Sequence, residues 1–260
     1  MTGPNMITPA QLMRLIGTPD APVIVDVRLP EDIGDDAQTV PSSIFYNHND
    51  TNALIRDLDG RPAVVICHKG MKLSQGVAAL IRAHGGQAEV LTGGFVGWIA
   101  AGLPVLSHAL IPQSGHWVTR LRPKIDRIAC PWLIKRFIAP RATILFVPRS
   151  DVLPVADRFD GVAFDADGAP YADQGGLCSF DALLDGFGLR NDPLDKMAQI
   201  IRAADTNDHN IAPQAAGLLA IFVGLSKMHR DDTQMLDAGM GVYDALYRWA
   251  RDGFDEGHAQ

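Results

Sequence analysis

The architecture of the chain follows from one segment, Ala63-Val64-Val65-Ile66-Cys67-His68-Lys69-Gly70-Met71-Lys72. Its apolar first half predicts a buried strand, and its second half is a cysteine followed by a loop with two lysines and a glycine. Residues 73–83 then carry apolar side chains three or four positions apart, which is the spacing of one face of a helix. The segment therefore predicts a strand, a cysteine loop and a helix in immediate succession.

Cys67 occupies a position that favours reactivity. It follows the carboxyl end of the predicted strand and faces the amino end of the next helix, where unpaired N–H groups and the helix dipole favour thiolate over thiol. Lys69 and Lys72 add positive charge to the same loop. A lone cysteine is also a common small buried residue, and it is the loop around Cys67 that favours chemistry over this structural interpretation.

The loop resembles the active-site loop of rhodanese-type sulfurtransferases, C-x-x-G-x-R, because this chain has Cys67-x-x-Gly70-x-Lys72. The resemblance covers about residues 5–107. It includes two further segments, Val23-Ile24-Val25-Asp26-Val27-Arg28 and Val90-Leu91-Thr92-Gly93-Gly94-Phe95-Val96-Gly97-Trp98. It implies a rhodanese-like α/β domain with a parallel sheet.

This resemblance also implies a chemistry, namely sulfur transfer through a persulfide on Cys67, with Lys72 as the second catalytic residue. The implied substrate-binding residues are His68, Lys69, Gly70, Met71, Asp26 and Arg28. A loop this short curls its backbone amides around one sulfur atom, whereas related phosphatases have one more loop residue and an arginine for phosphate. Lysine at position 72 lacks the two-pronged grip of arginine, so we expect thiosulfate to be a poor donor.

The composition is that of a globular cytoplasmic protein. With 260 residues, of which 47% are hydrophobic and 20% charged, the chain is long enough for one large or two ordinary domains. Its three cysteines are far apart and odd in number, which fits a reducing compartment and no disulfide framework. Neither a signal peptide nor a bilayer-spanning apolar run is visible, so we expect a cytoplasmic location and no membrane partner.

Patterning divides the chain into residues 1–107, a linker at 108–115 and residues 116–260. In the first domain, strands alternate with helices, which predicts a parallel sheet covered on both faces. In the second domain, strands come early and helices late, which predicts an α+β, mostly helical domain. Its strands are expected at 117–122, 142–147 and 162–165, and its later helices at 180–187, 194–204, 213–228 and 234–249.

One helix of the second domain has its start set by a proline. Residues 126–138 show a helical pattern, but a proline inside a helix removes a hydrogen bond, whereas at the first helical position it does no harm. We therefore predict that Pro131 begins this helix and that Cys130 lies at or next to its N-cap.

The second domain resembles a known family. The motif Asp126-Arg127-Ile128-Ala129-Cys130-Pro131-Trp132-Leu133-Ile134, with Trp117-Val118-Thr119-Arg120 before it and Cys178-Ser179-Phe180-Asp181 after it, is similar to the C-terminal domain of chromate-resistance proteins of the B type. The resemblance spans about residues 116–252. It implies a link to bacterial chromate resistance as a sensor, regulator or accessory factor.

The second domain opens with a basic segment. Residues 116–149 hold eight Lys or Arg against one acidic residue, in a chain of net charge −7. A helix start ringed by basic groups binds small dianions such as chromate or sulfate, which predicts an anion site of Arg120, Arg122, Lys124, Arg127 and Cys130. A solvated basic strand beside a buried cysteine is the equal alternative. Nucleic acid is not an expected partner.

Acidic residues of the second domain are candidates for a metal site. Asp205, Asp208 and His209 are spaced so that a helix would bring them to one side, and Asp173 and Cys178 are candidates for the same site. Asp-rich turns at helix ends are more commonly caps. We therefore expect that no cofactor is required, with a metal ion in the second domain as the alternative.

Two functions follow from these observations. The leading one is a rhodanese-type sulfurtransferase linked to chromate or oxyanion resistance, in which a small sulfur-donor anion loads Cys67 and a thiol or cyanide accepts the sulfur. The alternative is an oxyanion-sensing or regulatory binding protein in which the rhodanese fold is a non-catalytic module.

Overall fold

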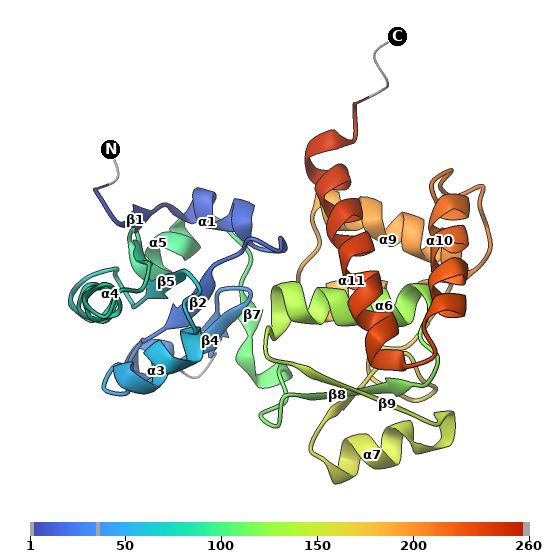
Figure 1. Ribbon diagram of the computed structural model, residues 1–260, viewed down its shortest axis with the longest axis horizontal. Coiled ribbons are helices and arrows are strands. Elements are labelled where there is room, and N and C mark those ends of the chain that lie inside the picture. Colours follow the sequence, from blue (N-terminus) through green and yellow to red (C-terminus); the bar gives the residue numbers. More distant parts are fainter. Residues whose placement is uncertain (1–2, 35–36, 257–260) are drawn as a thin grey trace. The chain divides into compact units, whose positions relative to one another are not determined.

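The computed structural model describes residues 3–34 and 37–256 (Figure 1). Residues 1–2, 35–36 and 257–260, which belong to the predicted domains 1–107 and 116–260, lie outside the described residues. The chain forms two compact units. The first comprises Met1–Leu110 with Arg136–Pro140, and the second comprises Ile111–Lys135 with Arg141–Gln260.

The first unit is built on a five-stranded sheet in which all neighbouring strands are parallel. The strand order is β1 (Met6–Ile7), β6 (Ala88–Leu91), β5 (Ala63–Ile66), β2 (Val23–Asp26), β4 (Ser43–Phe45). Its helices are α1 (Pro9–Leu15), α2 (Pro30–Ile33), α3 (Thr51–Leu58), α4 (Lys72–Ala83) and α5 (Gly94–Ala100). Two short strands, β3 (Gln38–Thr39) and β7 (Leu106–Ser107), pair antiparallel. The parallel sheet with interleaved helices confirms the predicted α/β architecture.

The central strand β5 explains why its sequence is apolar without alternation. A parallel strand covered on both faces buries every side chain, and all four residues of β5 are buried. On one face, Val65 packs with Val77 and Ile81 of α4 and with Val90 of β6. This packing holds the carboxyl end of β5, and the residue that follows it, at a fixed place on the edge of the sheet.

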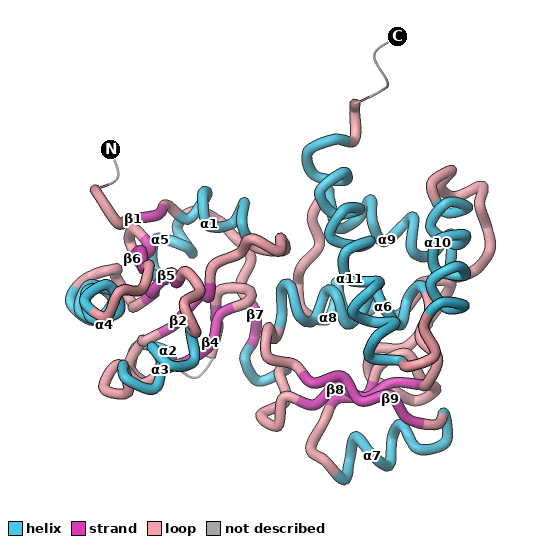
Figure 2. Tube along the Cα trace, viewed as in Figure 1, coloured by secondary structure: helices cyan, strands magenta, loops and turns pink. Residues whose placement is uncertain are grey.

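The second unit contains a three-stranded parallel sheet with β8 (His116–Arg120) between β9 (Thr143–Val147) and β10 (Val162–Ala163). Helix α7 (Val152–Arg158) packs on one face through contacts of Val152 and Ala156 with Val118. The longer helices gather on the other face (Figures 1 and 2). They are α6 (Ile125–Leu133), α8 (Ser179–Gly186), α9 (Asp192–Asp205), α10 (Ala215–Met228) and α11 (Asp232–Arg248).

The last four helices begin and end within two residues of the predicted ranges. The unit is thus mostly helical with a small sheet, as the sequence predicts. No helix in the described parts of the chain is long and apolar enough to cross a bilayer.

The predicted start of the helix after β8 is wrong. Helix α6 begins at Ile125, directly after an extended Lys124, and Pro131 lies inside it. An interior proline costs about 3 kcal/mol, but a buried large apolar side chain contributes about 1.5–3 kcal/mol, and Ile128, Trp132 and Leu133 are all fully buried. Burial therefore outweighs the lost hydrogen bond. A π-helical turn, Ile134–Ile138, follows directly.

Candidate functional site

Cys67 lies where the sequence predicts, between the end of β5 and the start of α4. Its side chain is largely buried, with 5% of the residue exposed. The backbone N–H of Met71 donates to Sγ at 3.3 Å. The hydroxyl of Ser74, on the first turn of α4, lies 3.0 Å from the same sulfur. The sulfur is thus held by polar groups from the loop and from the helix that follows it.

The first turn of α5 holds the cysteine loop through backbone hydrogen bonds. The N–H groups of Phe95 and Val96 donate to the carbonyl oxygens of Cys67 and His68, each at 3.0 Å. Because no peptide bond among residues 3–34 and 37–256 is cis, the N–H of each of these peptide groups points opposite to its carbonyl. The N–H groups of His68 and Lys69 therefore point away from α5.

Two glycines make this close approach possible. Gly94 has φ +59°, and a Cβ there would lie 2.3 Å from both the Cys67 carbonyl oxygen and the Gly70 nitrogen. Gly70 has φ +70°, and its Cβ would lie 2.6 Å from the Leu91 carbonyl oxygen. Both positions need the left-handed backbone region and have no room for a side chain. Gly70, predicted to bind substrate, therefore shapes the loop.

A pocket of about 440 Å³ opens beside the cysteine. The loop lines it with Cys67, His68, Lys69, Met71 and Lys72. Leu29, Asp32 and Leu73 complete the lining. Lys69 and Lys72 are exposed, so their charges reach both the pocket and the solvent. The predicted catalytic pair and three of the predicted substrate-binding residues thus meet in one place.

Asp26 and Arg28 were expected to bind substrate, but the structure places them elsewhere. Both side chains are fully buried and form an ion pair of 2.7 Å, and neither lines the pocket beside Cys67. Burial raises the pKa of the Asp26 carboxyl, and the bonds from Arg28 oppose that shift. The Arg28 guanidinium also lies 3.8 Å from the centroid of the Phe95 ring. The pair therefore supports the residue whose N–H holds the Cys67 carbonyl.

In the second unit, Asp126 is the centre of a polar cluster. It lies on the first turn of α6 and is 2% exposed. Its carboxylate accepts from the N–H groups of Ser179 and Phe180, at 3.0 and 3.1 Å. These are the first residues of α8, where free N–H groups and the helix dipole favour a negative charge. Asp126 thus ties the starts of α6 and α8 together.

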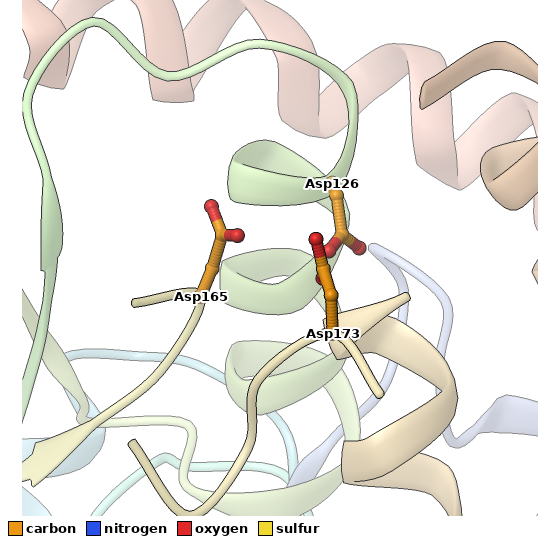
Figure 3. Close-up of side chains that lie close together, drawn as sticks. All are labelled: Asp126, Asp165 and Asp173. Atoms are coloured by element: carbon orange, nitrogen blue, oxygen red, sulfur yellow. The ribbon is translucent and has the colours of Figure 1, made fainter. Parts of the chain in front are cut away.

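Two further carboxylates gather at the same place (Figure 3). Ligand oxygens of Asp126, Asp165 and Asp173 lie within 4.8 Å of one another. Asp165 pairs with Arg120 at 2.8 Å and with Arg127 at 3.0 Å. Burial raises the pKa of Asp165 to about 6, although both arginines oppose the shift. Burial, and then the neighbouring carboxylates, raise the pKa of Asp126 well above its ordinary value.

The cluster offers oxygen ligands only, which suits hard divalent cations such as Mg²⁺ or Mn²⁺. The carboxylates of Asp126 and Asp165 already accept bonds from two amides and two guanidinium groups. Asp173 is exposed and accepts from the N–H and hydroxyl of Ser179. A cation here would have to compete with these partners.

Two family models match separate parts of the chain. The family model "ChrB, C-terminal domain" matches residues 117–250, which is more than half of the chain. The chain belongs to the ChrB C-terminal domain family. A second model, "Rhodanese-like domain", matches residues 8–101. Both resemblances inferred from the sequence are confirmed.

Individual relatives match parts of the chain. Protein ChrB of Cupriavidus metallidurans is 38% identical over 136 residues, which is 52% of this chain and 40% of that protein. The chain therefore matches less than half the length of this curated relative. Among solved structures, a rhodanese-related protein from Thermoplasma volcanium is 23% identical over 40% of this chain and 99% of its own, with a TM-score of 0.35. Thiosulfate sulfurtransferase from Pseudomonas aeruginosa is 22% identical over 39% of this chain and 19% of its own, with a TM-score of 0.33.

In the ChrB C-terminal domain, the expected anion site around Cys130 has a different character. Cys130 is fully buried inside α6, and its Sγ donates to Asp126 at 3.4 Å. Burial and the charge of Asp126 raise the pKa of this thiol well above its ordinary value. Arg120 and Arg127 are bound to Asp165, while Arg122 and Lys124 are exposed. The surroundings of Cys130 are therefore acidic, and the thiol stays protonated.

The metal candidates of this domain are only partly brought together. Asp173, Cys178 and Asp205 line one pocket of about 190 Å³. Desolvation of the Asp205 carboxylate and the nearby charge of Asp173 raise its pKa. Cys178 is buried at the N-cap of α8, and burial raises its pKa. Asp208 and His209 are exposed on the turn after α9 and do not line this pocket.

Sequence reasoning missed several residues of both sites. In the rhodanese-like domain these are Ser74 and Asp32. In the ChrB C-terminal domain they are Asp126 and Asp165. The signal for Asp165 was its place at the end of a short predicted strand, because the carboxyl ends of parallel strands meet at one edge. The signal for Ser74 was its place in the first turn of the helix that follows the cysteine loop. Nothing local in the sequence marks Asp32.

Proposed function

We propose that the rhodanese-like domain is a sulfurtransferase that carries sulfur as a persulfide on Cys67. The Cys67 thiolate attacks the sulfane sulfur of a donor and forms a new S–S bond. The old S–S bond of the donor breaks, and its electron pair leaves with the rest of the donor, for example as sulfite from thiosulfate. An acceptor thiolate then attacks the outer sulfur, and Cys67 leaves as a thiolate again.

The observation that carries this proposal is the bond from the Met71 N–H to Cys67 Sγ, on a sulfur that opens into a pocket lined by two lysines. An N–H aimed at sulfur stabilises its anionic form. The carbonyls of Cys67 and His68 are bound by α5, so the repulsive ends of these two peptide groups are directed away from the charge.

Lys69 and Lys72 supply the long-range part of this stabilisation. Both are exposed residues of the pocket, and a lysine beside a thiolate favours the charged form. The point charge of Lys72 attracts an anionic donor without the paired hydrogen bonds that arginine would make. The geometry therefore supports binding of a donor, with little orientation of a thiosulfate head.

We further propose that this activity serves chromate or oxyanion resistance. The proposal rests on membership of the ChrB C-terminal domain family and on the similarity to Protein ChrB. The structure assigns no oxyanion site to Arg120 and Arg127, since both are paired with Asp165. The link to oxyanions is therefore proposed through the sulfur chemistry of Cys67.

Intact-mass measurement after incubation with sulfur donors tests the sulfurtransferase. Wild-type chain should gain one sulfur atom, and Cys67→Ser should gain none. The matched controls are Cys130→Ser and Cys178→Ser, which should gain sulfur as the wild type does because both thiols are buried and protonated. An unmodified wild-type mass with thiosulfate and with organic persulfides would refute the enzyme.

A further inference from the structure

The pocket beside Cys67 is large for an inorganic sulfur donor. Its volume of about 440 Å³ falls within the roughly 300–1,000 Å³ of pockets that enclose organic ligands. Thiosulfate would fill a small part of it. The space next to the sulfur therefore fits a donor with an organic body.

The charges around the pocket are of both signs. Asp32, on the short helix α2, is half-buried and lines the pocket together with Lys69 and Lys72. Within the described parts of the chain, no ion pair joins Asp32 to either lysine. Asp32 and the two lysines thus line the same pocket without pairing with one another. A dianion is repelled by Asp32, whereas a zwitterion finds a partner for each of its charges.

Three further lining residues are apolar, and Cys67 and His68 complete the lining. Leu29 and Leu73 are half-buried, and Met71 is 65% exposed at the loop. A methionine side chain adapts its shape to the ligand that it covers. The pocket therefore offers an apolar wall between the positive and negative groups, which suits the carbon chain of an amino acid or short peptide.

We propose that the sulfur donor of this site is a zwitterionic organic persulfide, the persulfide of an amino-acid or short-peptide thiol. This inference rests on the proposed function and names its substrate class. The ammonium group of the donor lies toward Asp32, and its carboxylate lies toward Lys69 and Lys72. The Cys67 thiolate attacks the outer sulfur of R–S–SH, the S–S bond breaks, and R–S⁻ leaves with the electron pair, so that the persulfide Cys67–S–SH remains.

A donor comparison on the full chain tests this assignment. The rate of sulfur gain at Cys67 is measured by stopping the reaction with an alkylating agent at set times and determining the intact mass of the chain. The donors are glutathione persulfide, its N-acetylated form without the ammonium group, and thiosulfate. The chains are wild type, Asp32→Asn, and Glu31→Gln as the matched control, since Glu31 is exposed and does not line the pocket.

Asp32→Asn should slow loading from glutathione persulfide about threefold to fivefold, which is the size of one partly exposed ion pair. It should leave loading from the N-acetylated donor and from thiosulfate equal or faster, because both are anions without an ammonium group. Glu31→Gln should match the wild type with every donor. Because donors differ in intrinsic reactivity, the decisive quantity is the effect of Asp32→Asn on the loading rate of glutathione persulfide compared with its effect on the N-acetylated form.

The outcomes separate this inference from the sulfurtransferase itself. If the wild type loads sulfur but Asp32→Asn changes all donors alike or none, the zwitterionic donor is excluded and the sulfurtransferase stands. If no donor loads the wild type, both proposals fall together.

Discussion

Cys67 and Cys130 are both buried cysteines on or near a helix, but their surroundings are opposite. Cys67 precedes α4, receives the Met71 N–H and shares its pocket with two lysines. Cys130 lies in the middle of α6, where the N–H groups are used within the helix, and its Sγ donates to a carboxylate. Burial alone therefore says little about a cysteine, because the sign of the charge around it decides whether a thiolate is stable.

The same comparison separates the two domains. The rhodanese-like domain directs the Met71 N–H of a tight loop at one sulfur. The ChrB C-terminal domain uses the starts of α6 and α8 to hold Asp126 and its neighbouring carboxylates. Helix starts attract negative charge in both domains. In the second domain the carboxylate of Asp126 already binds the N–H groups at the start of α8, so an external anion cannot bind them.

Alkylation would break this contrast most decisively. In the native chain, iodoacetamide should modify Cys67 while Cys130 and Cys178 stay intact, since both are at most 3% exposed and protonated. Reaction of these two requires opening of the fold, which at a stability of about 5 kcal/mol or more slows it by at least about three orders of magnitude. Peptide mass mapping after a timed reaction measures the ratio. Comparable modification of Cys130 would show that the two environments are not different.

Gly94→Ala should cause the next largest effect. A Cβ at this position would lie 2.3 Å from the Cys67 carbonyl oxygen and requires φ +59°, a strained conformation that alone costs about 1–3 kcal/mol. Sulfur loading at Cys67 should fall at least about tenfold as the loop moves, and the chemical-denaturation midpoint should drop. Gly76→Ala is the control, because that helical position has open space and no positive φ. Normal loading by Gly94→Ala would mean that α5 does not shape the loop.

The acidic cluster should give the second domain a pH dependence of unusual sign. The folded pKa of Asp165 is about 6, above its ordinary value of 3.8. Between these two pH values the folded chain keeps a proton that the unfolded chain has released, so stability falls as pH rises through this window and levels off above it. The share of Asp165 amounts to at most about 3 kcal/mol.

Urea midpoints between pH 4 and pH 7.5 measure that dependence. Asp165→Asn should flatten the fall, whereas Asp167→Asn, on an exposed side chain whose pKa is lowered by Arg149, should leave it in place. Identical pH profiles for the wild type and Asp165→Asn would show that Arg120 and Arg127 fully compensate the buried charge.

Divalent metal ions should have the smallest effect. Amides and guanidinium groups already bind Asp126 and Asp165, so Mn²⁺ or Mg²⁺ should shift the melting temperature by less than about 2 °C, which is below ~1 kcal/mol. Thermal unfolding of the wild type and of Asp173→Asn with and without metal provides the measurement. A larger shift that disappears in Asp173→Asn would establish a metal site in this domain.

Much of the first domain follows from local sequence. The continuous apolar run Ala63–Ile66 and the helical spacing after Lys72 place Cys67 correctly, because burial of β5 and the period of α4 are both visible in the sequence. The role of Asp26 and Arg28 is not visible in this way. Whether a charged pair faces substrate or stays buried depends on which residues cover it, and here Phe95 does so from 67 positions further along the chain than Arg28.

The second domain shows where local rules fail. A rule about proline places the start of α6 six residues too late, because the buried surface of the whole helix outweighs one missing hydrogen bond. The cluster of Asp126, Asp165 and Asp173 depends on three segments that only the fold brings together. The sequence shows the basic charge of residues 116–149, but Asp165, the one carboxylate that pairs with both Arg120 and Arg127, lies on a distant loop.

The buried pair of Asp26 and Arg28 changes how inactive variants should be interpreted. Removing either partner leaves an uncompensated charge in the interior, which destabilises a protein by about 3–5 kcal/mol. Nη1 of Arg28 has no hydrogen-bond partner among the described residues, and the guanidinium carbon lies 3.8 Å from the centroid of the Phe95 ring. The guanidinium therefore packs against the residue whose N–H binds the Cys67 carbonyl. Loss of activity in Arg28→Ala would therefore indicate a destabilised domain. Loss of activity in a Lys72 variant would instead indicate loss of the proposed contact with the donor.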